Sequence, residues 1–442
     1  MRRLFALPLM LASLPSPAAR LVVEPLQGAG DRPLHIAVEG LDPIAPVQIR
    51  MTMRDAKGQP WSAKANLHAD ANGVADVASA GAEDGSSYAG VDADGLIWSM
   101  LPESGKGEPL PFPIVHRDDG LLFRPAEFVI EAYQGERLLG RQVAQRWLAS
   151  PQVRAEPAHI PGVVANLYYP QGAREDGKRH PVVITLGGAE GGIEAANDYA
   201  AWLASNGFIG LALAYYRMPG LPKDLIRVPI DPIATAMTWL QAQPFVAADG
   251  IGVMGGSWGG IVSLAIASHD PRVRAVVAWV GSPTPYPGIR RDVAPADFRT
   301  EDVPALTWHG QPLPYLPFRP GVNWAAPQTA EQAATLERAL LPIERINGPV
   351  LLVGSGDDRL AFSGDMAVVA LRRLQARRSV PQPDQLLYYS DAGHLITQMR
   401  QPTTFRHQAG PYIPVGGSPQ GYARADRDSS AKVLAFLHAA LK

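Results

Sequence analysis

The feature that most constrains this 442-residue chain is a glycine-rich turn, Gly-Gly-Ser-Trp-Gly at residues 255–259, between two apolar runs. Residues 251–254 predict a buried strand, and the small apolar residues 261–267 predict a buried helix. Ser257 is therefore expected on a strand-to-helix turn, the context in which a G-x-S-x-G motif forms a nucleophile elbow. The flanking glycines allow the strand and the helix to approach closely. We expect the serine hydroxyl to project into a crevice at the carboxyl end of a sheet.

A serine hydroxyl is a weak nucleophile at neutral pH and needs a base, which in turn needs an orienting acid. His394 follows a predicted strand in a Gly-His turn, which makes it the candidate base. Asp357 and Asp358 both follow the apolar run 350–353, so both are expected at the carboxyl edge of a sheet. We predict Asp357 as the acid and keep Asp358 as the alternative. The order serine, aspartate, histidine along the chain is typical of α/β-hydrolases.

Stabilising an oxyanion requires two preorganised donors. The first is expected to be the backbone N–H of Trp258, the residue after the nucleophile. The second is expected from residues 187–192, Gly-Gly-Ala-Glu-Gly-Gly, where Gly188 lets the backbone approach a substrate and Ala189 or Glu190 supplies the N–H. No Gly-Lys-Ser/Thr follows this loop, so it does not predict a phosphate site. An additional role for the Glu190 carboxylate in the site stays open.

Two segments with different patterns of apolar residues indicate two domains. Residues 20–150 contain short alternating strands separated by turns, which predict an immunoglobulin-like β-sandwich. Strands and helices alternate through residues 151–442, which predicts a mostly parallel, doubly wound sheet. A proline- and aromatic-rich insertion at about residues 282–348 is expected to form a cap with apolar walls for an acyl group. A surface insertion that packs on the body is the alternative.

Composition excludes several classes of function. The chain has no cysteine, which excludes disulfides, thiolate catalysis and cysteine-ligated zinc. Its net charge is −2 and it has no basic stripe, so we expect no nucleic-acid partner. Nothing predicts a metal, a cofactor or a protein partner. Residues 1–19 have the outline of a secretory signal peptide, too short to span a bilayer stably, so we expect export to the periplasm or the medium.

Several further motifs resemble one family, the acyl-CoA thioesterases and bile acid-CoA:amino acid N-acyltransferases. The resemblance covers nearly the whole mature chain and implies an immunoglobulin-like sandwich joined to an α/β-hydrolase. It implies that Ser257, Asp357 and His394 form a catalytic triad. The motifs that carry it are Asp-Ala-Asn-Gly-Val-Ala-Asp at 70–76, the run at 87–99, Ala-Leu-Ala-Tyr-Tyr at 212–216, Gly-Gly-Ser-Trp-Gly-Gly at 255–260, Gly-Asp-Asp at 356–358, Ala-Gly-His at 392–394 and Gly-Gly-Ser-Pro at 416–419.

The same resemblance implies an acyl-CoA thioesterase. The acyltransferase branch of the family uses cysteine where this chain has Ser257, which favours water as the acyl acceptor. Two alternatives remain, an exported carboxylesterase acting on a non-CoA ester and a catalytically inactive secreted binding protein. The predicted signal peptide motivates the first, because coenzyme A thioesters are not expected outside the cytoplasm. The chain also has Gly421-Tyr422-Ala423 where the family usually shows a histidine.

Overall fold

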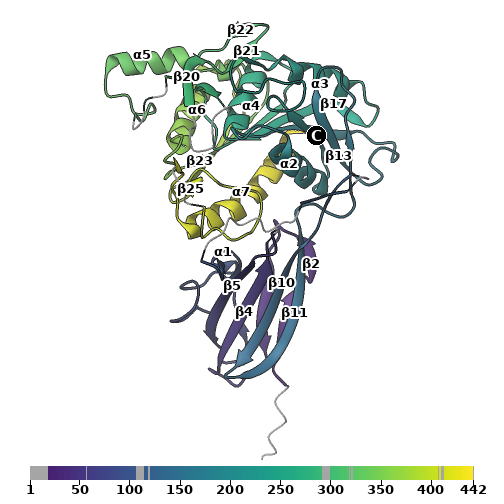
Figure 1. Cartoon of the computed structure of the whole chain (residues 1–442), viewed down its shortest axis with the longest axis vertical. Coiled ribbons are helices and arrows are strands. Elements are labelled where there is room, and N and C mark those ends of the chain that lie inside the picture. The colour runs from purple at the N-terminus through teal and green to yellow at the C-terminus, as the bar shows by residue number, and fades with distance from the viewer. Residues whose placement is uncertain are drawn as a thin grey trace, which may run out of the picture.

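The computed structural model describes residues 18–55, 57–105, 114–117, 120–290, 299–317, 319, 322–406, 408–409 and 413–441. The predicted signal peptide lies outside these ranges except for its last two residues. Figure 1 shows a β-rich N-terminal part, in purple and blue, at one end of the long axis and a larger mixed part, in teal to yellow, at the other. The last strand of the first part ends at Trp147 and the first strand of the second begins at Val153, on either side of the predicted boundary.

Two larger sheets form the N-terminal part, in the orders β1-β3-β6 and β2-β11-β10-β4-β5-β7, and β8 and β9 pair separately. Every second residue of β4 is buried, from Val47 to Met53, as the period of two predicts. Buried side chains from both sheets belong to one apolar cluster, so the predicted β-sandwich is confirmed. The elements are β1 (Arg20–Glu24), β2 (Gln27–Ala29), β3 (His35–Glu39), β4 (Pro46–Arg54), β5 (Pro60–His68), β6 (Ala75–Asp76), α1 (Gly95–Trp98), β7 (Leu101–Pro102), β8 (Ile114–Arg117), β9 (Gly120–Phe123), β10 (Ala126–Gln134) and β11 (Arg137–Trp147).

An eight-stranded sheet, in the order β12-β13-β15-β14-β17-β18-β23-β24, forms the centre of the larger part. β12 and β13 are antiparallel at one edge, and β15, β14, β17, β18, β23 and β24 pair in parallel. Every residue of β15 and β18 is buried, as expected for strands covered on both faces. The sheet elements are β12 (Val153–Pro157), β13 (Val164–Pro170), β14 (His180–Leu186), β15 (Ile209–Ala214), β17 (Val246–Gly256), β18 (Ala275–Trp279), β23 (Val350–Ser355) and β24 (Gln385–Tyr389).

Helices cover both faces of this sheet. Side chains of α2 (Glu194–Ser205) and α7 (Pro419–Ala440) pack on one face. Side chains of α3 (Asp231–Gln241), α4 (Trp258–His269) and α6 (Ser363–Arg377) pack on the other. The architecture is therefore the predicted α/β-hydrolase, a doubly wound and mostly parallel sheet, with an N-terminal sandwich.

The closing helix is longer than the sequence pattern predicts. The apolar pattern of residues 431–441 by itself predicts a closing helix over those residues, but α7 begins at Pro419. The Ser418 hydroxyl accepts a hydrogen bond from the Gly421 N–H, so Ser418 is the N-cap and Pro419 occupies the first turn. The additional turns bring helix residues next to the turn that carries His394.

The insertion lies at the end of the molecule away from the sandwich, where Figure 1 shows β20, β21, β22 and α5 in green. Trp324 and Leu336 of the insertion pack with Met366 of α6 in a small apolar cluster of their own. β16 pairs with β21, and β19 pairs with β20. The elements of the insertion are β19 (Pro287–Arg290), β20 (Arg299–Pro304), β21 (Leu306–Trp308), β22 (Gln311–Pro312), α5 (Ala330–Ala339) and η1 (Ile343–Arg345). Outside it lie β16 (Val228–Pro229), β25 (Gln408–Ala409) and β26 (Ile413–Pro414), of which the last two pair with each other.

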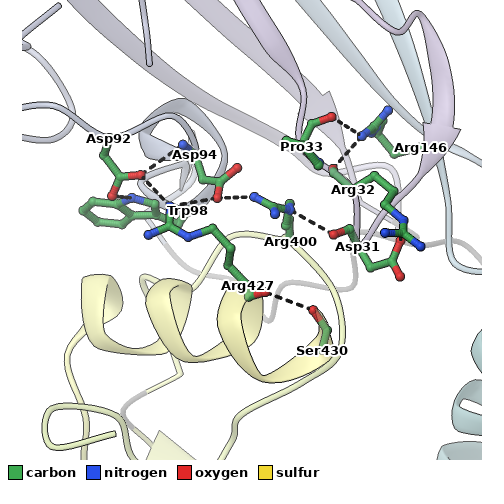
Figure 2. A network of polar contacts seen from close by, with 10 residues as sticks. All are labelled: Asp31, Arg32, Pro33, Asp92, Asp94, Trp98, Arg146, Arg400, Arg427 and Ser430. Atoms are coloured by element: carbon green, nitrogen blue, oxygen red, sulfur yellow. Dashed lines mark hydrogen bonds and ion pairs between the residues drawn. The ribbon is translucent and has the colours of Figure 1, made fainter. Parts of the chain in front are cut away.

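A network of ion pairs joins the two domains. Figure 2 shows Arg400, from the loop after His394, reaching Asp94 of the sandwich and the Asp31 carbonyl oxygen, the latter at 3.1 Å. Arg427 of α7 pairs with Asp92 at 3.4 Å and with Asp94 at 3.2 Å. The side chains of Arg400 and Asp94 are 11% and 5% exposed, so this pair is largely removed from water.

Replacing Arg400 by alanine is expected to lower the free energy of unfolding by about 3 kcal/mol, because it leaves a buried Asp94 carboxylate with one cation fewer. Thermal denaturation of the purified protein measures the effect. The matched control is Arg424→Ala on α7, whose pair with Asp391 is 52% and 41% exposed. It is expected to cost about 1 kcal/mol or less. Equal losses in the two variants would contradict a structural role for the buried pair.

No helix in the described part of the chain combines the length and the apolar character that crossing a membrane requires. Among the same residues, no three acidic or histidine side chains come together in a way that could hold a metal ion.

Candidate active site

The turn at Ser257 has the geometry expected of a nucleophile elbow. Ser257 lies between β17 and α4 with φ of 54° and ψ of −118°. Residues other than glycine rarely adopt this backbone conformation. Its N–H donates to the Trp279 carbonyl oxygen at 2.8 Å, which holds the turn against the next strand. A Cβ on Gly255 would collide with the backbone of Gly259, and a Cβ on Gly259 would collide with the Leu186 carbonyl oxygen. Both glycines are therefore required for close packing of the strand and the helix.

Ser257, His394 and Asp358 form a chain of two hydrogen bonds. His394 Nε2 lies 2.8 Å from Ser257 Oγ, and His394 Nδ1 lies 2.8 Å from Asp358 Oδ2. The imidazole and the carboxylate are buried, at 6% and 0% side-chain exposure. Backbone N–H groups of residues 360, 361 and 363 also donate to the Asp358 carboxylate, at 2.9–3.2 Å. They fix it at the start of α6.

The prediction of Asp357 as the acid next to His394 is corrected by this geometry. The Asp357 carboxylate turns outward and pairs with Arg359 at 2.9 Å, and it also accepts the Gly417 N–H at 2.8 Å. Successive residues of a tight turn point in different directions, so only one of the two aspartates can face the histidine. Asp358, the alternative, occupies that position.

Electrostatic interactions between Asp358 and His394 favour a negative charge on Asp358 and a proton on His394. Burial opposes the Asp358 charge, but His394 and the hydrogen bonds to the carboxylate outweigh it and lower the pKa of Asp358 below its ordinary value. Burial alone would lower the pKa of His394, yet the charge and hydrogen bond of Asp358, with a contribution from Glu190, raise it. Asp358 therefore stabilises an imidazolium at His394.

Two backbone N–H groups next to Ser257 are suited to hold an oxyanion. Trp258 is the first residue of α4, where N–H groups have no partner within the helix and the helix dipole is positive. Ala189 lines the same pocket as Ser257 and His394. The Gly188 N–H donates to Glu190 Oε1 at 2.7 Å, so Gly188 is engaged within its own loop. Of the two predicted donors, Ala189 and Glu190, only Ala189 lines the pocket with Ser257 and His394, so its N–H is the better placed.

Residues far along the chain hold the His394 turn, a role that the sequence analysis does not assign to them. The His394 N–H donates to the Val415 carbonyl oxygen at 2.9 Å. The Tyr422 hydroxyl donates to the Gly416 carbonyl oxygen at 2.9 Å, and the Leu395 N–H donates to that hydroxyl at 3.4 Å. Gly416 packs so tightly on Asp357 that a Cβ would overlap the Asp357 carbonyl oxygen. The Gly-Gly-Ser-Pro motif at residues 416–419 was the sequence signal for these contacts.

The insertion supplies part of a pocket that opens at Ser257. Tyr286 lies edge-on to Trp258, with ring centroids 6.3 Å apart, and its hydroxyl donates to the Ala361 carbonyl oxygen at 3.2 Å. The lining is mostly apolar, and Tyr286, Pro287 and Ile289 of the insertion contribute to it. Its residues are Ala189, Ser257, Trp258, Ile261, Val280, Gly281, Ser282, Tyr286, Pro287, Ile289, Thr300, Leu360, Ala361 and His394.

Comparison with known proteins identifies the family. Residues 228–442 match the BAAT/acyl-CoA thioester hydrolase C-terminal family, and residues 31–159 match the acyl-CoA thioester hydrolase/BAAT N-terminal region. Acyl-coenzyme A thioesterase 1 of Rattus norvegicus is 31% identical over 95% of this chain and 96% of its own length. The chain belongs to the acyl-CoA thioesterase/BAAT family. This membership confirms the resemblance predicted from the sequence and the predicted enzyme class, a thioester or ester hydrolase.

Two further proteins are similar to this chain. The peroxisomal succinyl-coenzyme A thioesterase of Mus musculus is 31% identical over 95% of this chain and 96% of its own length. Among solved structures, a dienelactone hydrolase-like promiscuous phosphotriesterase from metagenomic libraries aligns with 66% of this chain and all of its own, at 18% identity and a TM-score of 0.42. Family membership therefore rests on the sequence comparisons, and the fold on the sheet order described above.

Proposed function

We propose that this family member hydrolyses acyl-CoA thioesters to a carboxylic acid and coenzyme A, with Ser257, His394 and Asp358 as a catalytic triad. The observation that carries the proposal is the hydrogen-bonded chain from Asp358 through His394 to Ser257, at the mouth of a mostly apolar pocket. The names of the thioesterases to which the chain is similar supply the substrate class.

The first half of the proposed reaction forms an acyl-enzyme. His394 Nε2 takes the proton of Ser257 Oγ, which attacks the thioester carbonyl carbon. The Trp258 and Ala189 N–H groups hold the negative charge that develops on the carbonyl oxygen. When the tetrahedral intermediate collapses, the carbon–sulfur bond breaks and the leaving thiolate takes the proton from His394. Asp358 stabilises the imidazolium between these two transfers.

The second half returns the free enzyme. His394 takes a proton from water, the resulting hydroxide attacks the acyl-serine, and Ser257 leaves with the proton. Serine rather than cysteine as nucleophile supports water as the acyl acceptor. The apolar walls supplied by the insertion suit an aliphatic acyl group, because burying each methylene contributes about 0.8 kcal/mol.

An exported esterase is the second candidate, and the signal-like residues 1–19 motivate it. Export after removal of this segment is part of that proposal. The two candidates share the acyl-enzyme chemistry and differ in the leaving group.

A substrate panel distinguishes them. Purified protein is assayed with acyl-CoA thioesters of increasing chain length and with p-nitrophenyl esters of the same acids, and Ser257→Ala serves as the blank. The chain has no cysteine, so a thiol reagent detects released coenzyme A without background from the protein. Cleavage of acyl-CoA supports the thioesterase. Cleavage of the esters alone would reject it in favour of the exported esterase.

A further inference from the structure

We propose that Tyr215, together with Tyr216 and Arg217, is a positioning residue for the oxyanion site. These three consecutive residues directly follow β15 and hold the loop that carries Ala189. The inference rests on the proposed function, because it concerns how that reaction's second oxyanion donor is held in place.

The three side chains bind four successive carbonyl oxygens of the loop. The Tyr215 hydroxyl lies 2.9 Å from the Gly187 oxygen and 3.2 Å from the Gly188 oxygen. The Tyr216 hydroxyl donates to the carbonyl oxygen of residue 189, and Arg217 Nη1 donates to that of residue 190 at 2.7 Å. Tyr215 and Tyr216 are buried, at 4% and 0% exposure, so water competes little for the hydrogen bonds of their hydroxyls.

Binding a carbonyl oxygen also orients the next N–H group. A trans peptide is planar, with its C=O and the following N–H pointing in opposite directions. Because the Gly188 oxygen faces the Tyr215 hydroxyl, the Ala189 N–H points away from Tyr215. The loop also lies close to the nucleophile, since a Cβ on Gly188 would lie 3.4 Å from the Ser257 Cβ. Tyr215 therefore sets the direction of the N–H assigned to the oxyanion.

The loop needs such anchors because of its composition. Four of its six residues at 187–192 are glycines, which allow the peptide planes to rotate more freely than other residues do. The Glu190 carboxylate supplies one further restraint, by accepting the Gly188 N–H at 2.7 Å. With carbonyls bound on one side and that N–H on the other, the Ala189 N–H is preorganised before substrate arrives. Preorganisation is what gives an oxyanion site its catalytic effect.

The test is Tyr215→Phe, which keeps the ring and removes the hydroxyl. We expect kcat on the best substrate of the panel to fall about 10–100-fold, somewhat less than the loss of an oxyanion donor outright. KM should stay within about twofold, because the N–H bonds more strongly to the oxyanion than to the carbonyl of bound substrate. The affinity for a trifluoromethyl ketone should fall in parallel with kcat. Ser257 adds to that ketone, its proton passes to His394, and the hemiketal oxygen becomes the oxyanion.

Tyr168→Phe is the matched control. Tyr168 is fully buried on the neighbouring strand β13, and its hydroxyl has no hydrogen-bond partner among the described residues. This variant should keep wild-type kcat and inhibitor affinity. Tyr216→Phe removes the hydrogen bond to the Ala189 carbonyl oxygen and is measured in parallel. It provides a second folded variant if Tyr215→Phe is unstable.

The inference is overturned if the folded variants at 215 and 216 match Tyr168→Phe in kcat and in affinity for the ketone. It is also overturned if their losses appear in KM or thermal stability and leave kcat unchanged. Failure of the proposed function gives a different result, in which Ser257→Ala stays active or the wild type cleaves only the p-nitrophenyl esters. Loss of activity in Ser257→Ala with full activity in the tyrosine variants would reject the positioning role alone.

Discussion

Replacing Ser257 by alanine is expected to lower kcat by about 10⁴–10⁶-fold, because the variant has no atom that can form the acyl-enzyme. The fold should survive, since Ser257 Oγ contacts only His394 among the described hydrogen-bond partners. Thermal denaturation checks the fold, and steady-state kinetics on the best substrate of the panel measures the loss. The remaining rate would come from water attacking a carbonyl that the oxyanion site still polarises.

Ser268→Ala provides the control. Ser268 is a buried serine near the other end of the same helix, where its hydroxyl donates to the Ala265 carbonyl oxygen at 2.8 Å. Its loss should leave kcat near the wild-type value. Comparable turnover in Ser257→Ala and Ser268→Ala would remove Ser257 from the mechanism.

The second large effect separates the two neighbouring aspartates. Asp358→Asn is expected to lower kcat by about 10⁴-fold, because an amide favours the wrong tautomer of His394 and cannot stabilise its cation. Asp357→Asn should change kcat by no more than about threefold, since exposed ion pairs such as the one with Arg359 contribute little. Both substitutions are isosteric and adjacent, so each controls for the other. A larger loss from Asp357→Asn would reinstate that residue as the acid.

The pH profile offers a second measurement on the same pair. His394 must be neutral to act as the base, and Asp358 raises its pKa. In the wild type, kcat/KM should therefore rise with pH through a pKa above the ordinary histidine value of about 6.5. Asp358→Asn removes the charge that favours the imidazolium. The rise of its residual kcat/KM with pH should therefore occur at lower pH than in the wild type. Asp357→Asn should not change the pH at which kcat/KM rises.

The sequence predicted the elements of the site that depend on local pattern. Glycines flank Ser257 because a Cβ there would collide with neighbouring backbone, and that requirement is visible as a G-x-S-x-G motif. His394 lies in a Gly-His turn after a strand, which placed it at the correct edge of the sheet. The order of strands and helices around these two residues was enough to predict the doubly wound sheet.

The choice between Asp357 and Asp358 depended on contacts that no local pattern contains. The Gly417 N–H, 60 residues further on, binds the Asp357 carboxylate and helps to turn it outward. Arg359, two residues downstream, was the nearest signal that Asp357 already had a partner. The network between the domains was equally inaccessible, since Arg400 and Asp94 are separated by 306 positions.

The contacts between the sandwich and the loop after His394 have a consequence for how this protein can be divided. The Arg400 N–H donates to the Gly30 carbonyl oxygen and the Thr403 N–H to that of Trp98, both at 3.1 Å. One apolar cluster also continues from the sandwich strands into α2, α7 and the face of the sheet that they cover. A fragment beginning near residue 151 would therefore lose the sandwich surface against which the loop after His394 packs. Anyone transplanting this hydrolase into a fusion or a shortened scaffold should carry the sandwich along as part of the catalytic unit.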